Sequence, residues 1–202
     1  MRPTIQAYLG LGANSGPARR SLERAVAALA DLPGAELTGI SRLYRTRPVG
    51  PVAQADFLNA VVGLRLTARK GPTREALDLL GELKHLERAL GRQGGVRWGP
   101  RAVDIDLLLF GEHAIRTGRT AAARSEDEAR AGRQWLEVPH PEAAHRLFVL
   151  APLAELAPAL RPPGWGLSVA EARDRAASVE GEGAVRAVAT WDTEVGGWTS
   201  EA

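Results

Sequence analysis

Cysteine is absent from the 202-residue chain, which excludes disulfide bonds and thiolate metal sites and is typical of a cytoplasmic protein. The chain also has no run of 18 apolar residues, and its opening residues lack the apolar region of a signal peptide, so we expect no membrane partner. Lysine is nearly absent, because 24 of the 26 basic residues are arginine. The formal net charge is only +2, although the pI is about 9.5. This balance gives no reason to expect nucleic acid as a partner.

What the chain does contain is the composition of a globular domain, with 45% hydrophobic and 25% charged residues. Apolar periodicity predicts two helices, over 17–34 and 72–91, each with proline in its first turn and glycine at its end. Strand-forming residues fill four other segments, at 4–12, 35–46, 56–66 and 103–110. The order strand, helix, strand, strand, helix, strand predicts an α+β fold. We expect a ferredoxin-like βαββαβ core, with an antiparallel sheet and the two helices packed on one face.

The remaining segments predict a single domain with two additions. Residues 113–134 carry many charges and few large apolar side chains, which predicts a solvent-exposed insertion. Residues 147–158 have the pattern of an apolar helix, and beyond residue 178 the pattern is too weak to indicate an element. We therefore expect one domain over 1–177, interrupted at 113–134, and a C-terminal extension over 178–202. We expect the protein to be a monomer.

Two aspartates interrupt the apolar segment "VDIDLLLF". Residues two apart in a strand point to the same side, so Asp104 and Asp106 share one face, while Val103, Ile105 and Leu107 take the other. Two carboxylates with converging oxygens suit Mg²⁺, which prefers one or two carboxylates together with water and phosphate oxygens. Such a pair can also hold two metal ions that clamp a transferring phosphoryl group. The alternative is a pair of solvated aspartates on the wet face of a sheet.

Basic residues lie just before the two aspartates. The stretch "GRQGGVRW" combines three glycines with Arg92 and Arg97, and Arg101 follows it. Arginine is suited to bidentate contacts with phosphate, and glycine makes a loop pliable. The stretch therefore indicates either a mobile basic lid over a phosphate group or an ordinary turn.

Other polar residues occupy positions where the pattern predicts apolar ones. Glu87 continues the helical series of Leu80 and Leu83, so its carboxylate either faces a site or lies at the edge of the apolar face. Asn59 lies within an apolar strand and needs hydrogen-bond partners, which either a flat heterocycle or the backbone could supply. His140 lies between two prolines. A lone histidine is more often structural than a ligand, and its spacing from His145 is no zinc signature by itself.

Together these segments resemble the 6-hydroxymethyl-7,8-dihydropterin pyrophosphokinase family. The resemblance is carried by "YLGLGANSG", "YRTRPVGP" with "DFLNAVV", "LERALGR" with "RWGPRAVDIDLLLFG", and "VPHPEAAHRLFVLAPLAELAP". The stretch "RWGPRAVDIDLL" is the most specific of these. The likeness covers residues 4 to 160 apart from the insertion. It implies transfer of pyrophosphate from ATP to the hydroxymethyl group of the pterin, with release of AMP, in folate biosynthesis, and with two Mg²⁺ ions.

The resemblance also implies a role for individual residues. Metal binding falls to Asp104 and Asp106. Catalysis falls to the same two aspartates with Arg92, Arg97 and Arg101. ATP binding falls to Glu87, Arg92, Arg97, Trp98, Arg101, Ile105, His140 and Arg146. Pterin binding falls to Thr46, Pro48, Val49, Phe57, Asn59, Trp98 and Phe148.

The chain departs from the family pattern at three positions. Gly94 stands where a second lid arginine is usual, Trp135 stands where some members have arginine, and Phe57 stands where tyrosine is common. Arginines of the insertion, with Arg133 first, could supply the missing charge. Two other functions stay open, an RNA-binding module of the same fold class and another metal-dependent transferase with a D-x-D motif. The first would need exposed aromatic residues on the sheet, yet aromatic residues make up only 5% of the chain.

Overall fold

The computed structural model describes residues 3–48, 54–91, 102–124, 135–181 and 183–200. Its helices are α1 (Ala18–Ala30), α2 (Pro72–Ala89), α3 (Leu147–Leu156) and α4 (Val169–Glu180), with the 3₁₀ turns η1 (Ala121–Ala123) and η3 (Ala143–His145). Its strands are β1 (Thr4–Ala13), β2 (Ala35–Ile40), β3 (Leu43–Thr46), β4 (Phe57–Thr67), β5 (Asp104–Phe110), β6 (Ile115–Gly118), β7 (Trp135–Val138), β8 (Val185–Asp192) and β9 (Gly197–Thr199). No helix within these residues is long and apolar enough to cross a membrane.

The main sheet is antiparallel, and its strands follow the order β5-β1-β4-β3-β8-β9, with β2 also paired to β4. β1 is central, because it pairs with β4 along its whole length and with β5 on its other side. The burial of β1 alternates strictly from residue to residue, as expected for a strand whose two faces meet different surroundings. The prediction of an α+β fold with an antiparallel sheet is confirmed.

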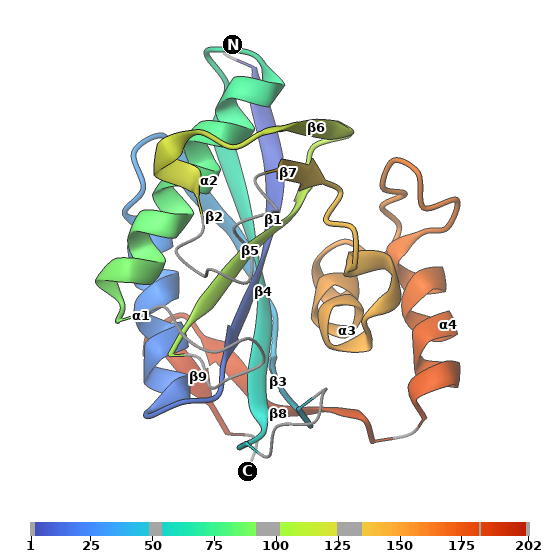
Figure 1. The fold of residues 1–202 in the computed structure, drawn as a ribbon. Helices are drawn as coiled ribbons and strands as arrows, with labels where there is room; N and C mark the ends of the chain where they lie inside the picture. Colours follow the sequence, from blue (N-terminus) through green and yellow to red (C-terminus); the bar gives the residue numbers. More distant parts are fainter. Residues whose placement is uncertain (1–2, 49–53, 92–101, 125–134, 182, 201–202) are drawn as a thin grey trace.

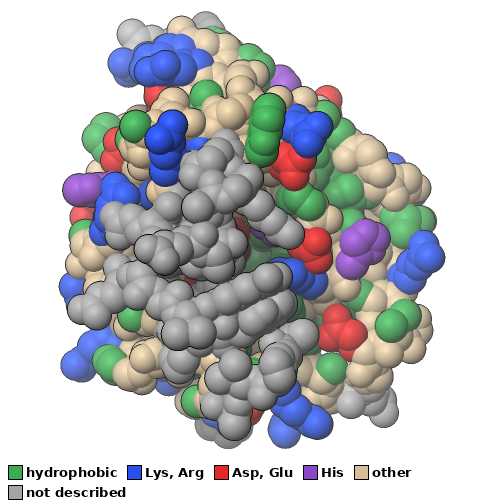
Figure 2. Space-filling model, viewed as in Figure 1, with side chains coloured by type: hydrophobic (Ala, Val, Ile, Leu, Met, Phe, Trp, Pro, Cys, Tyr) green, Lys and Arg blue, Asp and Glu red, His purple; other side chains and the backbone are tan. Residues whose placement is uncertain are grey.

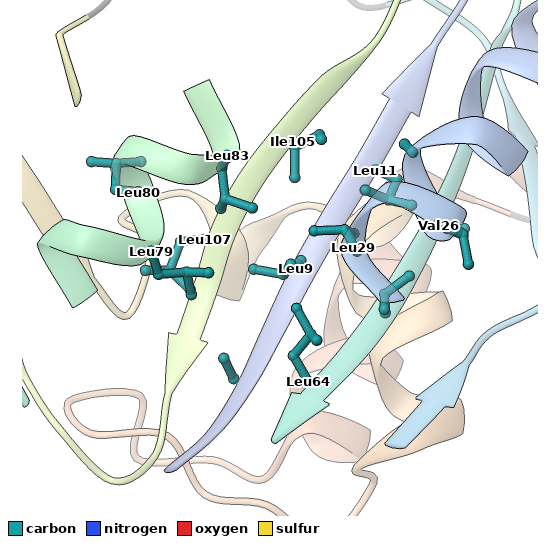
Figure 3. Packing of buried hydrophobic residues seen from close by; sticks show 14 of the residues in the cluster. Leu9, Leu11, Val26, Leu29, Leu64, Leu79, Leu80, Leu83, Ile105 and Leu107 are labelled. Carbon is teal, nitrogen blue, oxygen red and sulfur yellow. The ribbon is translucent and has the colours of Figure 1, made fainter. Parts of the chain in front are cut away.

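Helices α1 and α2 cover one face of the sheet, as predicted (Figure 1). Their leucine and valine side chains meet the inward-facing residues of β1, β4 and β5, which Figure 3 shows from close by. The labelled residues of this core are Leu9, Leu11, Val26, Leu29, Leu64, Leu79, Leu80, Leu83, Ile105 and Leu107. The apolar periodicity of the two helices is therefore explained by this one packing surface.

Helices α3 and α4 form a third layer on the opposite face (Figure 1). Here Val61 of β4 and Leu108 of β5 pack with Leu150 and Leu153 of α3 and Ala172 of α4. The helix predicted over 147–158 is α3, although the sequence did not indicate which face of the sheet it covers. This packing explains why α3 is apolar over most of its surface, since the helix is covered both by the sheet and by α4.

The predicted strand over 35–46 is divided into β2 and β3, which both pair with β4. The break falls at Ser41, whose Oγ accepts a hydrogen bond from the Val61 amide at 2.9 Å and donates to the Arg42 carbonyl at 2.8 Å. The serine side chain thus supplies an acceptor where the strand is interrupted.

Residues 113–124 differ from the prediction of a solvent-exposed insertion. They form β6 and η1, and the side chains of Ile115 and Ala123 are buried in the α1/α2 core. β6 pairs with β7 in a separate two-stranded sheet. This pairing and the two buried side chains hold a segment that is otherwise polar against the core. Residues 125–134, with Arg133, lie outside the described residues.

The C-terminal extension also has structure that its sequence did not predict. β8 pairs with β3 and so extends the main sheet, and β9 pairs with β8. Trp198 of β9 is only 1% exposed. Its Nε1 donates to the Ser41 carbonyl at 2.9 Å, and its ring meets that of Trp191 edge-on at 4.7 Å. The end of the described chain is thereby fixed at the break between β2 and β3.

We predict that Trp198→Ala lowers the free energy of unfolding by about 3–5 kcal/mol, because it removes a fully buried aromatic side chain. Urea unfolding at pH 7 measures the loss. Trp135→Ala is the matched control: Trp135 is 51% exposed and stacks only on Arg116, so its removal should cost less than about 1 kcal/mol. Similar losses for the two variants would contradict this role of Trp198.

Candidate active site

The two aspartates of β5 lie on the sheet face that α3 covers. Ile105 and Leu107 belong to the core beneath α1 and α2, so Asp104 and Asp106 point to the opposite side, as the alternation of a strand requires. Both are partly exposed. The predicted sharing of one face is therefore what the structure shows, and two carboxylates two residues apart fit the donors that Mg²⁺ prefers.

Glycines of β1 lie beside both aspartates. Gly12 is opposite Asp104 and Gly10 is opposite Asp106, and on its other side Gly12 is opposite Asn59 of β4. A Cβ on Gly12 would lie 3.1 Å from Asn59 Oδ1, closer than an ordinary contact. The row Asn59–Gly12–Asp104 crosses three strands, so its two polar ends are about 10 Å apart. No β1 side chain stands between them.

Asn59 is buried, 7% exposed, and its amide nitrogen donates to Thr46 Oγ1 at 2.8 Å. Thr46 lies on β3 opposite Phe57, which places Thr46, Phe57 and Asn59 on the same face of the sheet. The need of Asn59 for a partner is therefore met by a side chain, and the structure brings these three predicted pterin residues together. Pro48 follows β3 and is partly exposed.

A second group of predicted residues lies between β7 and α3. The His140 amide donates to the carbonyl of Leu108 on β5 at 2.8 Å, two residues from Asp106. Arg146 forms an ion pair with Glu142 at 3.3 Å, and its guanidinium carbon lies 5.8 Å from the centroid of the Phe148 ring. His140 is thus attached to the strand that carries the aspartates, and Arg146 is in contact with Phe148.

Glu87 contacts the same strand from the other face. It is 2% exposed, its Oε2 lies 2.8 Å from Lys84 Nζ, and its Oε1 accepts a hydrogen bond from the Ile105 amide at 2.8 Å. Ile105 is the residue between the two aspartates, so the buried ion pair fixes the backbone of the predicted metal site. The sequence suggested a carboxylate facing the nucleotide, and a direct contact of Glu87 with ATP stays a prediction.

The sequence missed a network that joins β3 to α3. Tyr44 lies opposite Asn59, and its hydroxyl donates to Glu155. The carboxylate of Glu155 also accepts from the Arg42 amide at 2.8 Å and from Arg42 Nε at 2.7 Å. Burial, followed by the bond to Glu155, raises the pKa of Tyr44 to about 12. The spacing of Tyr44 from Thr46, two residues along one strand, could have indicated that both share the face of Asn59.

Several predicted residues lie outside the described residues. These are Val49, Arg92, Gly94, Arg97, Trp98 and Arg101. The described part of the chain also contains no cluster of three or more histidine, aspartate and glutamate side chains that could hold a metal ion by itself. Two carboxylates leave most of the coordination of Mg²⁺ to other ligands, and in nucleotide sites water and phosphate oxygens commonly supply them.

Charge on the visible face is mixed. In Figure 2 basic and acidic side chains are interspersed over the described residues on this face. Surfaces that bind nucleic acid typically gather basic side chains into a patch or stripe. The charge distribution on this face therefore does not favour the RNA-binding alternative.

The pKa of Tyr44 predicts a pH dependence of stability. Between pH 10 and about 12 the unfolded tyrosine loses its proton, whereas the folded one keeps it. The folded state then binds more protons, so the stabilisation by Tyr44 is complete below pH 10 and is lost as the pH rises through about 12. We expect the difference in unfolding free energy between wild type and Tyr44→Phe to shrink from pH 9 to pH 12. Denaturant unfolding measures it, and a constant difference would contradict the prediction.

Comparison with known proteins gives one consistent answer. The sequence profile of the family described as 7,8-dihydro-6-hydroxymethylpterin-pyrophosphokinase (HPPK) matches residues 8–158. A 2-amino-4-hydroxy-6-hydroxymethyldihydropteridine pyrophosphokinase of Pseudomonas aeruginosa is 38% identical over 156 residues, which are 77% of this chain and 83% of that protein. The protein of the same name from Bacillus subtilis is 39% identical over 150 residues, 74% of this chain and 77% of that one.

Solved structures show the same fold. Wild-type HPPK-DHPS of Plasmodium falciparum superposes with a TM-score of 0.72 at 15% identity, over 99% of this chain and 50% of that one. The likeness therefore includes residues beyond 158, although the chain spans only half of that protein. On the match of the profile and the identity to these relatives, the chain belongs to the 7,8-dihydro-6-hydroxymethylpterin-pyrophosphokinase family.

Proposed function

We propose that this chain transfers pyrophosphate from ATP to the hydroxymethyl group of 6-hydroxymethyl-7,8-dihydropterin and releases AMP, as a step in folate biosynthesis. Membership of the family supports the reaction. The structural observation that supports this reaction best is the row of paired residues Asn59, Gly12 and Asp104. This row holds an amide suited to a heterocycle and a carboxylate suited to a metal–phosphate complex on one face, about 10 Å apart.

The pterin end of the proposed site is formed by β3, β4 and α3. Asn59 offers a carbonyl acceptor and a donor that is shared with Thr46, and a pterin presents both kinds of group along its edge. Phe57 and Phe148 supply aromatic faces for the ring. Pro48, Val49 and Trp98 complete the proposed pterin contacts.

The nucleotide end is formed by β5 and the segments beside it. Asp104 and Asp106 would hold two Mg²⁺ ions, which when bound neutralise the charge of the phosphates. We assign phosphate binding to Arg92, Arg97 and Arg101, because guanidinium groups bind phosphate in bidentate geometry. Trp98, His140 and Arg146 complete the ATP contacts. The Ile105 side chain lies in the core and its amide donates to Glu87, so we assign its ATP contact to its backbone carbonyl.

The proposed reaction is an exchange of one bond at phosphorus. The hydroxymethyl oxygen of the pterin forms a bond to the β-phosphorus of ATP, and the bond from that phosphorus to the bridging oxygen of AMP breaks. The hydroxyl proton passes to water, and AMP leaves with the bridging oxygen. The contribution of the protein is to position the two substrates and to stabilise the charge of the transferring group.

We further propose a ferredoxin-like core within the larger sheet. Counting β2 and β3 as one interrupted strand, the chain order β1-α1-β2/β3-β4-α2-β5 is βαββαβ, and the spatial order β5-β1-β4-β2/β3 supports that assignment. The division into a domain over 1–177, with residues 113–134 inserted, and an extension over 178–202 stays a prediction. So do the monomeric state and the cytoplasmic location.

The metal assignment predicts that Asp106→Asn lowers kcat at least about a hundredfold while the protein stays folded, because charge stabilisation of the transferring group is lost. Formation of AMP from ATP and the pterin alcohol, at saturating Mg²⁺, measures the change. Asp174→Asn is the matched control, since Asp174 is an exposed residue of α4 paired with the adjacent Arg173, and it should keep wild-type kcat. A near-normal kcat for Asp106→Asn would exclude an essential ligand role.

The pterin assignment predicts that Asn59→Ala weakens pterin binding by roughly 5- to 150-fold, which corresponds to the loss of a buried hydrogen-bonding group worth about 1–3 kcal/mol. Affinity for an ATP analogue should stay within about twofold of wild type, because the amide lies two strands away from Asp104. Calorimetric titration with each ligand separates the two effects. Equal losses for pterin and nucleotide would refute the assignment.

A further inference from the structure

Helix α3 begins between two residues of the proposed site and has no cap of its own. Arg146 is its N-cap residue and makes no side-chain cap hydrogen bond, and Phe148 lies in its first turn. The amide of Leu147, between them, donates instead to Oε1 of Glu180 at 2.9 Å. Amides in the first turn of a helix lack partners within it, and a carboxylate there also interacts favourably with the helix dipole. Glu180 thus supplies the cap from the last residue of α4.

The chain that follows Glu180 reaches β3, the strand that carries Thr46 of the proposed site. Val185, five residues later, pairs with Thr46 on β3, and Arg186 pairs with Arg45. Thr46 is the residue that accepts the hydrogen bond of Asn59. Five residues span at most about 18 Å, so the start of α3 and the end of β3 are tied to one short stretch of chain. That stretch lies beyond residues 8–158, which match the family profile.

From these contacts we propose that Glu180 is a positioning residue for the pterin. Its carboxylate fixes the first turn of α3, and with it the Phe148 ring, relative to Thr46 on β3 and Asn59 on β4. The proposal rests on the assignment of Phe148 and Asn59 to the pterin site made above. The C-terminal extension would then contribute to substrate binding indirectly. Its Glu180 contacts the Leu147 amide of α3 and does not contact the substrate.

The contacts of Arg146 indicate that loss of Glu180 affects pterin binding and ATP binding differently. Its guanidinium is held by Glu142 at 3.3 Å, outside α3, so loss of the Glu180 contact leaves this anchor intact. Phe148 lies in the first turn of α3, one residue after the capped amide, so its backbone position depends on that turn. Loss of Glu180 should therefore affect the pterin more than ATP.

The test compares Glu180→Ala, Glu180→Gln and Glu194→Ala in the full chain. Glu180→Ala should raise the KM for the pterin about fivefold, the size of a lost helix cap of about 1 kcal/mol, and change the KM for ATP less than about twofold. Glu180→Gln keeps an acceptor oxygen and should recover most of the loss. Glu194→Ala makes the same change of charge in the turn between β8 and β9, and should match wild type.

A second comparison asks whether Glu180 acts through Phe148. In a Phe148→Ala background, Glu180→Ala should add no further loss of pterin affinity, because coupled residues are not additive. Additive losses would overturn the proposal. So would an unchanged pterin KM in Glu180→Ala, or equal losses for both substrates with a lower melting temperature, which would indicate a structural role only. Failure of the proposed function is distinguishable, because the wild-type chain itself would then form no AMP from ATP and the pterin alcohol.

Discussion

The register of β1 between β4 and β5 is the constraint on which the site depends. It sets Gly12 between Asn59 and Asp104 and Gly10 beside Asp106. A slip of one residue would turn every side chain of β1 to the other face, placing Leu9 and Leu11 on the site face and glycines in the core. Because Leu9 and Leu11 are almost fully buried beneath α1 and α2, the apolar core enforces the register that aligns the polar residues on the opposite face.

Much of this arrangement could be predicted from local pattern. The alternation of "VDIDL" places the aspartates opposite Ile105 because a strand has a period of two, and the leucines of α2 repeat with the period of a helix. The buried partner of Glu87 was also within reach, since Lys84 lies three residues earlier on the same helical face. The sequence interpretation placed Glu87 at a site or at the edge of the apolar face, whereas the buried ion pair lets its carboxylate serve the β5 backbone.

What could not be predicted depends on contacts between distant parts of the chain. β8 is a strand because β3, some 140 residues earlier, offers it an edge, and strand formation depends strongly on such tertiary context. Residues 113–124 have few apolar side chains, but Ile115 and Ala123 find places in the core that their neighbours in sequence do not indicate. The role of Glu155 could not be predicted either, because its partners Tyr44 and Arg42 lie more than a hundred residues away in the sequence.

Carboxylates hold α3 to its surroundings at both ends. Near its C-terminal end Glu155 accepts from Tyr44 and Arg42 at the start of β3, and at its N-terminal end the Leu147 amide donates to Glu180. The elements that supply these partners, β3 and the α4–β8 segment, are themselves paired through Thr46 and Val185. The helix and the strand that face the proposed pterin are therefore connected by polar contacts rather than by apolar packing alone. A site held in this way before the substrate arrives loses less conformational entropy on binding, so more of the contact energy is retained as affinity.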